Sequence, residues 1–241
     1  MKMKKLSIIV CMTCCSMGLL AQNAPGKFSV KPMAGINVST FAGDNSDFFK
    51  SKVGFTGGAE VEYGINNWLG LSLGMLYSEQ GGKMEANAMA EQGTGDSKEM
   101  VFVTIKGKLK SSYLSLPLLA NVYIPAVKGL AVKAGLQLGI LLKDKMTTDQ
   151  QIVTRTFSDV NSYYEVLEGT NTITRTESFF SGSDVLKSID FGIPVGLSYE
   201  FKNITLDARY YFGLTKIDDT KDAEDIKNRH FSVTLGYRFH L

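Results

Sequence analysis

The last eleven residues of the chain alternate strictly between large apolar and small or polar side chains. The apolar positions are Phe231, Val233, Leu235, Tyr237, Phe239 and Leu241. The positions between them hold Ser232, Thr234, Gly236, Arg238 and His240. Because successive side chains of a β-strand point to opposite faces, this period of two predicts a terminal strand with one apolar and one polar face.

The same alternation recurs along the chain and predicts eight strands. They are expected near residues 28–41, 52–65, 67–78, 110–124, 129–142, 187–201, 203–215 and 229–241. No linker rich in Pro or Ser divides them, so one domain is the simplest organisation. After the N-terminal segment, no run reaches the roughly 18 consecutive apolar residues of a transmembrane helix. The pattern therefore indicates an all-β fold, a single antiparallel barrel of about eight strands.

The connections between these strands alternate between short and long. Tight turns are expected at Asn66-Asn67, at residues 125–128 and at Lys202-Asn203. Longer polar segments lie near residues 42–51, 79–109, 143–186 and 216–228. Barrels of bacterial outer membranes have short periplasmic turns and long extracellular loops. The spacing therefore favours a transmembrane barrel with both chain ends in the periplasm.

The charged residues within the expected strands all lie on the face opposite the large apolar side chains. They are Lys31, Glu60, Glu62, Lys133, Asp190, Glu200, Asp207, Arg209 and Arg238. A Lys or Arg that faces lipid at the membrane midplane costs about 2–4 kcal/mol, so an apolar face that meets lipid explains the exclusion. A soluble, secreted barrel of the lipocalin kind would also keep charge off its buried apolar face, and it stays open as an alternative.

Small residues crowd the polar face and favour an inward position for it. The glycines expected there are Gly54, Gly58, Gly64, Gly70, Gly74, Gly135, Gly139, Gly192, Gly196, Gly213 and Gly236. Small inward residues let eight strands curl around a few large polar side chains. Aromatic residues bunch near the strand ends, as in the two interfacial girdles of membrane barrels. One girdle would hold Tyr63, Trp68, Tyr123, Tyr199 and Phe239, and the other Tyr77, Tyr113, Phe212 and Phe231.

The chain begins with a basic stretch followed by an apolar run from Leu6 to Ala21, which is typical of a signal peptide. We expect residues 1–21 to be cleaved, which leaves residues 22–241 as the mature barrel domain. All three cysteines lie within the leader, so the mature chain needs no disulfide framework. The leader also holds three of the 26 basic residues, and its removal leaves 23 against 24 acidic residues. That balance offers no electrostatic basis for binding nucleic acid.

Several segments resemble PorT-like outer-membrane β-barrel proteins. Residues 112–121, Ser-Tyr-Leu-Ser-Leu-Pro-Leu-Leu-Ala-Asn, resemble the family's strand motif, and residues 191–201 with 206–215 look like its last hairpin. With the final strand, the resemblance covers most of the mature chain. It implies a small barrel of OmpX-like architecture in the outer membrane of a Gram-negative bacterium. Such barrels commonly end on an aromatic residue that the outer-membrane assembly machinery reads, whereas here His240 and Leu241 follow Phe239.

The nine charges on the polar face comprise five acids and four bases and are close to neutral together. We interpret them as a structural network that fills the lumen, because the interior of an eight-stranded barrel is just wide enough for side chains. A small porin-like path for ions or solutes is the alternative.

Only His230 and His240 are available as a histidine general base, and they are expected at opposite ends of the barrel. No G-x-S-x-G or H-E-x-x-H pattern accompanies either one, and no P-loop, EF-hand or zinc-ligand spacing occurs. We therefore expect no enzymatic activity, no cofactor and no metal. An outer-membrane hydrolase is the alternative.

The two longest connections, residues 79–109 and 143–186, carry β patterns of their own. Residues 100–106 continue the alternation upstream of the fourth strand. Residues 152–157 and 173–179 are expected to pair as a hairpin that extends strands five and six. A protruding sheet with an open edge can capture a partner strand, although natural proteins usually blunt such edges. The leading hypothesis is a structural or interaction protein whose two long loops contact an extracellular protein or surface ligand.

Overall fold

The computed structural model describes residues 25–43, 49–92, 97–158, 163–178, 187–216 and 226–241 of the 241-residue chain. The expected leader, residues 1–21, lies outside these ranges. The strands are β1 Phe28–Ala42, β2 Phe49–Gly64, β3 Leu69–Gln92, β4 Ser97–Tyr123, β5 Leu130–Ser158, β6 Tyr163–Ser178, β7 Ile189–Phe201, β8 Ile204–Gly213, β9 Lys227–Tyr237 and β10 Phe239–His240. Within the described ranges, no helix has the length and hydropathy to cross a membrane.

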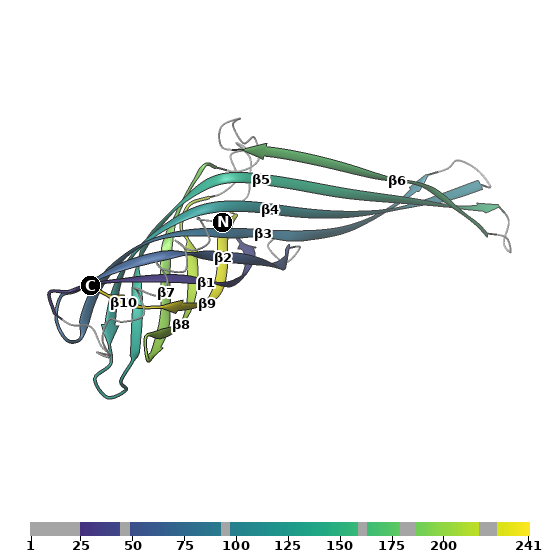
Figure 1. The fold of residues 1–241 in the computed structure, drawn as a ribbon. Helices are drawn as coiled ribbons and strands as arrows, with labels where there is room; N and C mark the ends of the chain where they lie inside the picture. The colour runs from purple at the N-terminus through teal and green to yellow at the C-terminus, as the bar shows by residue number, and fades with distance from the viewer. Residues whose placement is uncertain (1–24, 44–48, 93–96, 159–162, 179–186, 217–225) are drawn as a thin grey trace, which may run out of the picture.

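Eight of the strands close into a ring (Figure 1). Neighbours pair in the order β1-β2-β3-β4-β5-β7-β8-β9. The ring closes where β9 pairs antiparallel with β1, from Gly236 opposite Met33 to Lys227 opposite Ala42. After Arg238, β10 continues β9 and pairs with the start of β1. The predicted antiparallel barrel of about eight strands is confirmed, and closure leaves the ring without an edge.

Tight turns join strands at one end of the ring, where the sequence predicts them. Lys202 and Asn203 form the turn between β7 and β8 with φ of 47° and 68°. Two successive positive φ values suit a two-residue hairpin, because they match the right-handed twist of the flanking strands. Between β2 and β3, the Asn66 side chain accepts the backbone N–H groups of Trp68 and Leu69 at 2.9 and 2.8 Å. We call this end of the barrel the turn end.

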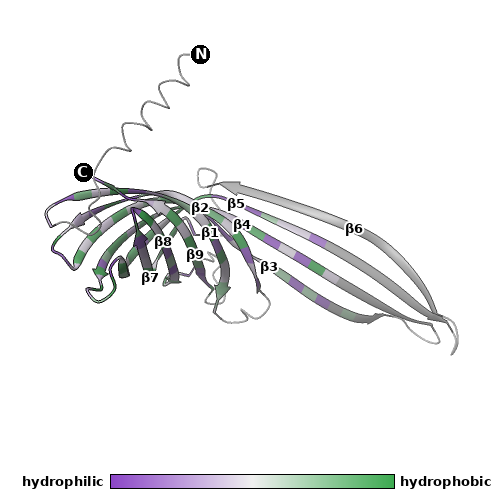
Figure 2. Ribbon diagram, turned by 60° about the horizontal axis from the view of Figure 1, so that its bottom comes forward, coloured by the Kyte–Doolittle hydropathy of each residue, from purple (hydrophilic) through white to green (hydrophobic). Residues whose placement is uncertain are grey.

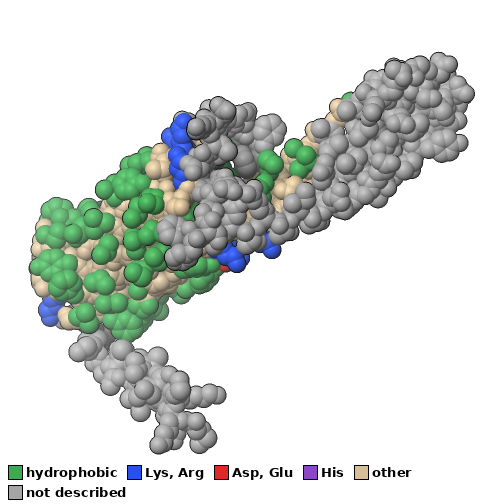
Figure 3. Space-filling view, turned by 90° about the horizontal axis from the view of Figure 1, so that it is seen from above, with side chains coloured by type: hydrophobic (Ala, Val, Ile, Leu, Met, Phe, Trp, Pro, Cys, Tyr) green, Lys and Arg blue, Asp and Glu red, His purple; other side chains and the backbone are tan. Residues whose placement is uncertain are grey.

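Hydrophobic and hydrophilic residues alternate along the ring strands (Figure 2), and buried positions alternate with exposed ones. On β1, Lys31 and Asn37 are buried in the lumen, whereas Ile36 is 56% exposed on the outer surface. Apolar side chains cover the outside of the ring (Figure 3). The apolar face therefore points outward, the opposite of the soluble lipocalin-like alternative.

Glycines on the inner face make room for large polar side chains, as expected. A Cβ at Gly74 would lie 2.9 Å from Pro117 Cγ and 3.0 Å from Glu60 Cγ. A Cβ at Gly192 would lie 2.6 Å from Tyr211 Cζ. Small residues at these positions thus let bulky groups from neighbouring strands occupy the narrow lumen.

Three ring strands, β3, β4 and β5, continue beyond the ring at the end opposite the turns and form one long sheet with β6 (Figure 1). β3 and β4 stay paired as far as Gln92 opposite Glu99. β4 and β5 stay paired as far as Ser97 opposite Ser158. β6 pairs with the outer half of β5. We call residues 81–92, 97–111, 143–158 and 163–178 the protruding sheet.

The predicted and observed structures differ most in this sheet. Residues 100–106 do continue the fourth strand, but most of segment 79–109, expected as a loop, is also strand. The expected hairpin forms with a different register, since residues 152–157 face 163–168 and residues 173–178 face 143–148. It extends β5 alone, because the next ring strand, β7, begins at Ile189. Alternation reveals the face a residue occupies, but it does not identify the partner opposite.

Candidate functional site

Five charged side chains from four ring strands meet in the lumen, and we call them the central cluster. They are Lys31 of β1, Glu60 of β2, Lys133 of β5, and Asp207 and Arg209 of β8. Lys31 Nζ lies 3.0 Å from Glu60 Oε2 and 3.6 Å from Asp207 Oδ2. Lys133 Nζ lies 3.4 and 2.7 Å from the same two oxygens. Arg209 Nε and Nη2 donate to the Asp207 carboxylate at 2.5 and 2.8 Å, and Nη1 pairs with Glu60.

Each carboxylate of the central cluster therefore contacts all three cations. This sharing matters because a buried ion is costly unless oppositely charged groups compensate it. Glu60 and Lys133 are each only 1% exposed. The central cluster contains three bases and two acids, so it has a net charge of one positive unit.

A second group, the turn-end cluster, surrounds Arg238 nearer the short turns. Arg238 Nη1 lies 3.1 Å from Glu62 Oε2, and its Nε lies 2.6 Å from Glu200 Oε2. The Tyr123 hydroxyl bridges the acid Glu62 and the base Arg238. It donates a hydrogen bond to Glu62 at 2.5 Å and accepts one from Arg238 Nη2 at 2.9 Å. Two acids against one base leave one negative charge, which offsets the surplus of the central cluster.

Asp190, the ninth of the predicted lumen charges, lies apart from both clusters. It accepts hydrogen bonds from Thr215 Oγ1 at 2.8 Å and from Asn228 Nδ2 at 2.9 Å. The structure thus brings eight of the nine predicted residues into two groups and places Asp190 in a third, neutral setting.

Two lumen residues were misplaced by the sequence analysis. Tyr113 and Tyr123 were assigned to the interfacial girdles, but they are 1% and 8% exposed and point into the barrel. Tyr113 shares its parity with buried Ser111 and Ser115 on the same strand. The alternation therefore indicates that Tyr113 faces the lumen. The prediction was wrong because aromatic residues near the strand ends were assigned to the girdles by residue type.

The two histidines lie in different surroundings. His230 of β9 is buried with its ring stacked on Tyr211, at 4.7 Å between ring centroids. His240 lies at the turn end, with Nδ1 3.3 Å from Asn203 Nδ2. Across the described residues, no group of three His, Cys, Asp or Glu side chains is arranged to hold a metal ion.

One cavity of about 20 Å³ lies between the central cluster and His230, and its lining includes Met33, Leu76, Arg209 and Tyr211. A cavity of this size holds about one water molecule.

The protruding sheet has two edges without a neighbouring strand among the described residues. β2 pairs with β3 only as far as Phe49 opposite Met84, so residues 85–92 pair with β4 alone. β6 pairs with β5 alone along its length. Each edge presents unpaired backbone N–H and C=O groups at every second residue.

A family model that matches most of the chain supports the barrel architecture. The model of a family described as outer membrane protein beta-barrel domain matches residues 20–219. Among solved structures, Ail, the attachment invasion locus protein of Yersinia pestis, is 16% identical over 90% of this chain and 100% of that chain, with a TM-score of 0.40. Neisserial surface protein A is 14% identical over 87% of this chain and 96% of that chain, with a TM-score of 0.35. No curated protein matches. The chain belongs to the outer-membrane β-barrel domain family whose model spans most of its length.

Proposed function

We propose that this protein is a non-enzymatic barrel that anchors the protruding sheet in the outer membrane and presents it to an extracellular protein or surface ligand. The observation that carries the proposal is the open edge of β6, which has 16 residues and pairs on one side only among the described residues.

The filled lumen supports a structural role for the barrel itself. Eight of its nine charges neutralise one another in two clusters, and the cavity beside the central cluster has room for about one water molecule. Such an interior braces the ring from inside, as expected for a barrel of eight strands whose lumen is just wide enough for side chains. The proposal therefore assigns recognition to the protruding sheet and not to the lumen.

The proposed orientation rests on the short turns and on the expected leader. A leader at residues 1–21 would direct export and leave the mature chain beginning at residue 22. Short turns are characteristic of the periplasmic side of such barrels, and long connections of the outer side. In this orientation, both chain ends are periplasmic, the protruding sheet is extracellular, and the assembly machinery inserts the barrel from the periplasm.

The open edge of β6 suits recognition by β-augmentation, in which a partner strand adds to a sheet through main-chain hydrogen bonds. At about 3.3 Å per residue, a strand of this length offers roughly 50 Å of edge. The partner would supply an extended segment, and side chains on alternate positions would select it.

A register-matched deletion tests this proposal. Removing residues 148–173 and inserting Asn-Gly joins Thr147 to Thr174, which face each other across β5 and β6, so the shortened hairpin keeps its pairing. The control removes residues 88–103 in the same way, because Asn87 faces Thr104 across β3 and β4. Both variants should keep the compact electrophoretic band that shifts on boiling.

Proteoliposomes that carry each variant are then bound to an array of extracellular proteins and surface polysaccharides. We expect the β5–β6 deletion to abolish binding and the β3–β4 deletion to retain it. Unchanged binding after the β5–β6 deletion, or no binding by the intact protein to any array member, would contradict the proposal.

A further inference from the structure

A group of lysines occupies one face of the protruding sheet, and of the start of β2 beside it, where the sheet leaves the ring. Pairing across the strands sets Lys50 opposite Lys83, Lys83 opposite Lys108, and Lys110 opposite Lys145. Residues paired in this way point to the same side of a sheet. We call Lys50, Lys83, Lys106, Lys108, Lys110 and Lys145 the lysine face, and all six side chains are exposed.

The lysine face continues the outer apolar surface of the barrel. On β4, Lys106, Lys108 and Lys110 share their parity with Leu118, which is 44% exposed on the outside of the ring. The pairing of β3 with β4 runs without a shift from Leu76 to Gln92, so the parity carries through. The lysines therefore stand directly above the part of the barrel that lipid surrounds.

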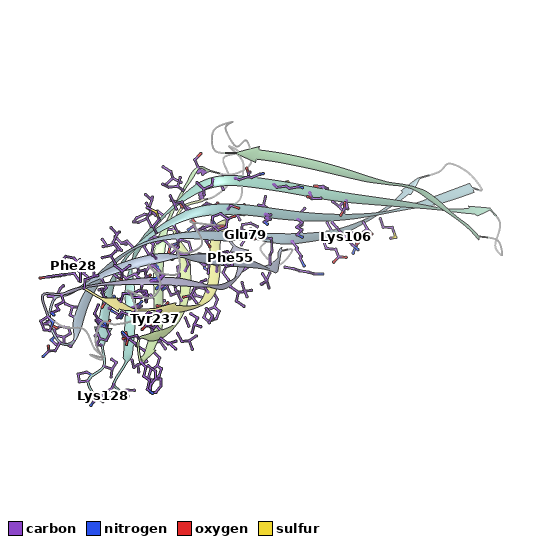
Figure 4. All side chains as sticks on the ribbon, viewed as in Figure 1. Phe28, Phe55, Glu79, Lys106, Lys128 and Tyr237 are labelled. Carbon is purple, nitrogen blue, oxygen red and sulfur yellow. The ribbon has the colours of Figure 1, made fainter. Side chains whose placement is uncertain are left out.

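Tyr77 marks where apolar side chains give way to charge. Its hydroxyl donates to Ser112 Oγ at 2.9 Å. Ser112 lies two residues farther out on β4 than Leu114, which faces Tyr77 across the two strands. Lys110 lies four residues beyond Leu114 on the same strand, about 13 Å farther out, and Lys108 lies about 20 Å out. Figure 4 shows Glu79 where the sheet leaves the ring and Lys106 farther along the sheet.

The positive charge of this face is only partly neutralised within the protein. Lys50 pairs with Glu85 at 2.7 Å, and Lys110 pairs with Glu79 at 3.0 Å. Lys83, Lys108 and Lys145 have no ion pair among the described residues. Among the described side chains, these six lysines are accompanied by three acids, Glu79, Glu85 and Asp149, which leaves an excess of three positive charges on the outward face.

The surface between these lysines is hollowed. Lys50, Lys83, Lys106 and Lys108 line a depression of about 160 Å³, together with Glu85 and Asp149. This volume has room for several water molecules and hence for a small anionic group. Lysine suits such a group because its ammonium is a point charge on a flexible stem that can turn toward an anion at the membrane surface.

We propose that the lysine face binds the phosphate groups of a phosphorylated glycolipid in the outer leaflet around the barrel. The placement of this face above the outer leaflet rests on the orientation in the proposed function, but not on any role of the open edges. The headgroup region adds only about 5–8 Å to each side of a hydrocarbon core, so phospholipid phosphates would lie below most of the lysines. In a glycolipid, phosphates on the sugars lie farther out than those of a phospholipid, so they can reach both Lys110 and Lys108.

The test compares two triple variants of the full mature protein in phosphatidylcholine nanodiscs. The first is Lys83→Gln, Lys108→Gln and Lys145→Gln, which removes the unpaired lysines. The control is Lys27→Gln, Lys128→Gln and Lys202→Gln, which removes three exposed charges at the turn end. The probe is rough-type lipopolysaccharide with its phosphates, compared with the same lipid after chemical dephosphorylation. Lipid retained per barrel is quantified by mass spectrometry.

We expect the first triple variant to retain at least about tenfold less phosphorylated lipid than the unmodified protein, since each lysine near an anionic surface adds to the attraction. The control should stay within about twofold, and raising the salt concentration should weaken retention because exposed charges are screened. Equal losses in both variants, or equal retention of phosphorylated and dephosphorylated lipid, would overturn the proposal. Displacement of the lipid by millimolar inorganic phosphate would overturn the assignment to a lipid.

Heat-modifiability of each variant establishes that its barrel is folded. If the first triple variant does not fold, Lys108→Gln alone is compared with Lys128→Gln alone. A loss confined to Lys108→Gln supports the lysine face, and equal retention by the two variants counts against it. None of these variants alters the β6 edge, so their results are independent of the augmentation test.

Discussion

Lys133 and Asp207 lie 74 residues apart in the chain, yet their side chains meet inside the barrel with Nζ 2.7 Å from Oδ2. Lys133 comes from β5 and Asp207 from β8, and β7 separates these strands in the ring. The contact therefore passes over β7 on the inner face of the barrel and does not join paired strands. Because both residues also contact other members of the central cluster, the ring is braced from within by charges that depend on one another.

Asp207→Ala should destabilise the barrel by about 3–5 kcal/mol, because it leaves three buried cations with Glu60 alone. The measurement is the urea concentration at which the folded electrophoretic band is half lost in detergent. Lys133→Met combined with Asp207→Ala is the matched comparison, since it removes a cation together with the anion. We expect the combined loss to be smaller than the sum of the single losses, and additive losses would contradict a shared network.

Tyr123→Phe should cost about 1.5–3 kcal/mol, the range for hydrogen bonds to charged groups. The change removes the hydroxyl that donates to Glu62 at 2.5 Å and accepts from Arg238 at 2.9 Å. Tyr77→Phe, at an exposed tyrosine, is the control and should change the urea midpoint little. A negligible effect of Tyr123→Phe would mean that the hydroxyl faces the membrane interface, as the sequence alone suggested.

Leu73→Arg tests whether the outer surface meets lipid. Leu73 is 60% exposed on the outside of β3. An arginine near the membrane midplane costs about 2–4 kcal/mol, so the variant should fold less stably into phosphatidylcholine vesicles. Val127→Arg, in a turn, should be tolerated. A soluble barrel would instead accept Leu73→Arg on its wet surface and stay in solution without detergent.

Reconstitution into planar bilayers tests the state of the lumen. Because side chains fill it, the unmodified protein should produce no steady single-channel steps. Glu60→Ala and Arg209→Ala serve as comparisons, since each removes part of the central cluster. Reproducible steps in the unmodified protein that respond to either substitution would establish conduction and would favour the transport alternative.

The pKa of Glu85, in the protruding sheet, should lie below its ordinary value of 4.5, because Lys50 donates a hydrogen bond to its carboxylate and adds a nearby positive charge. A lowered folded-state pKa means that the pair stabilises the sheet above the unfolded pKa and loses this effect as the pH falls through the folded one. Carbon-13 NMR of the Glu85 carboxyl measures the shift. Lys50→Gln should raise the pKa toward 4.5, and an unchanged value would show that Lys50 is not responsible.

Much of the barrel could be predicted from alternation alone. The ring strands and the short turns occur close to where the sequence placed them. The nine charges lie on the inner face, as the parity of Glu60 with Glu62 and of Asp207 with Arg209 indicates. A strand with a strict period of two has only two faces, so exclusion of charge from one of them assigns all its residues together.

The contacts between distant strands could not be obtained in this way. Nothing in the alternation distinguishes Glu60 from Glu62, yet Glu60 joins the central cluster and Glu62 joins Arg238. The level of a side chain in the lumen depends on the stagger between strands around the closed ring, which is a property of the whole barrel. The same limit applies to the β5–β6 hairpin, whose strands were recognised but paired in the wrong register.

The sequence by itself thus determined the fold class, the approximate position of the ring strands and the inner or outer face of most of their side chains, because these follow from a local period of two. Tertiary structure decided which charges neutralise one another, the burial of Tyr113 and Tyr123, and the continuation of β3, β4 and β5 into a sheet with open edges. It also aligned lysines from β2, β3, β4 and β5 on one face. These features depend on register between strands far apart in the chain, and register is settled only when the ring closes.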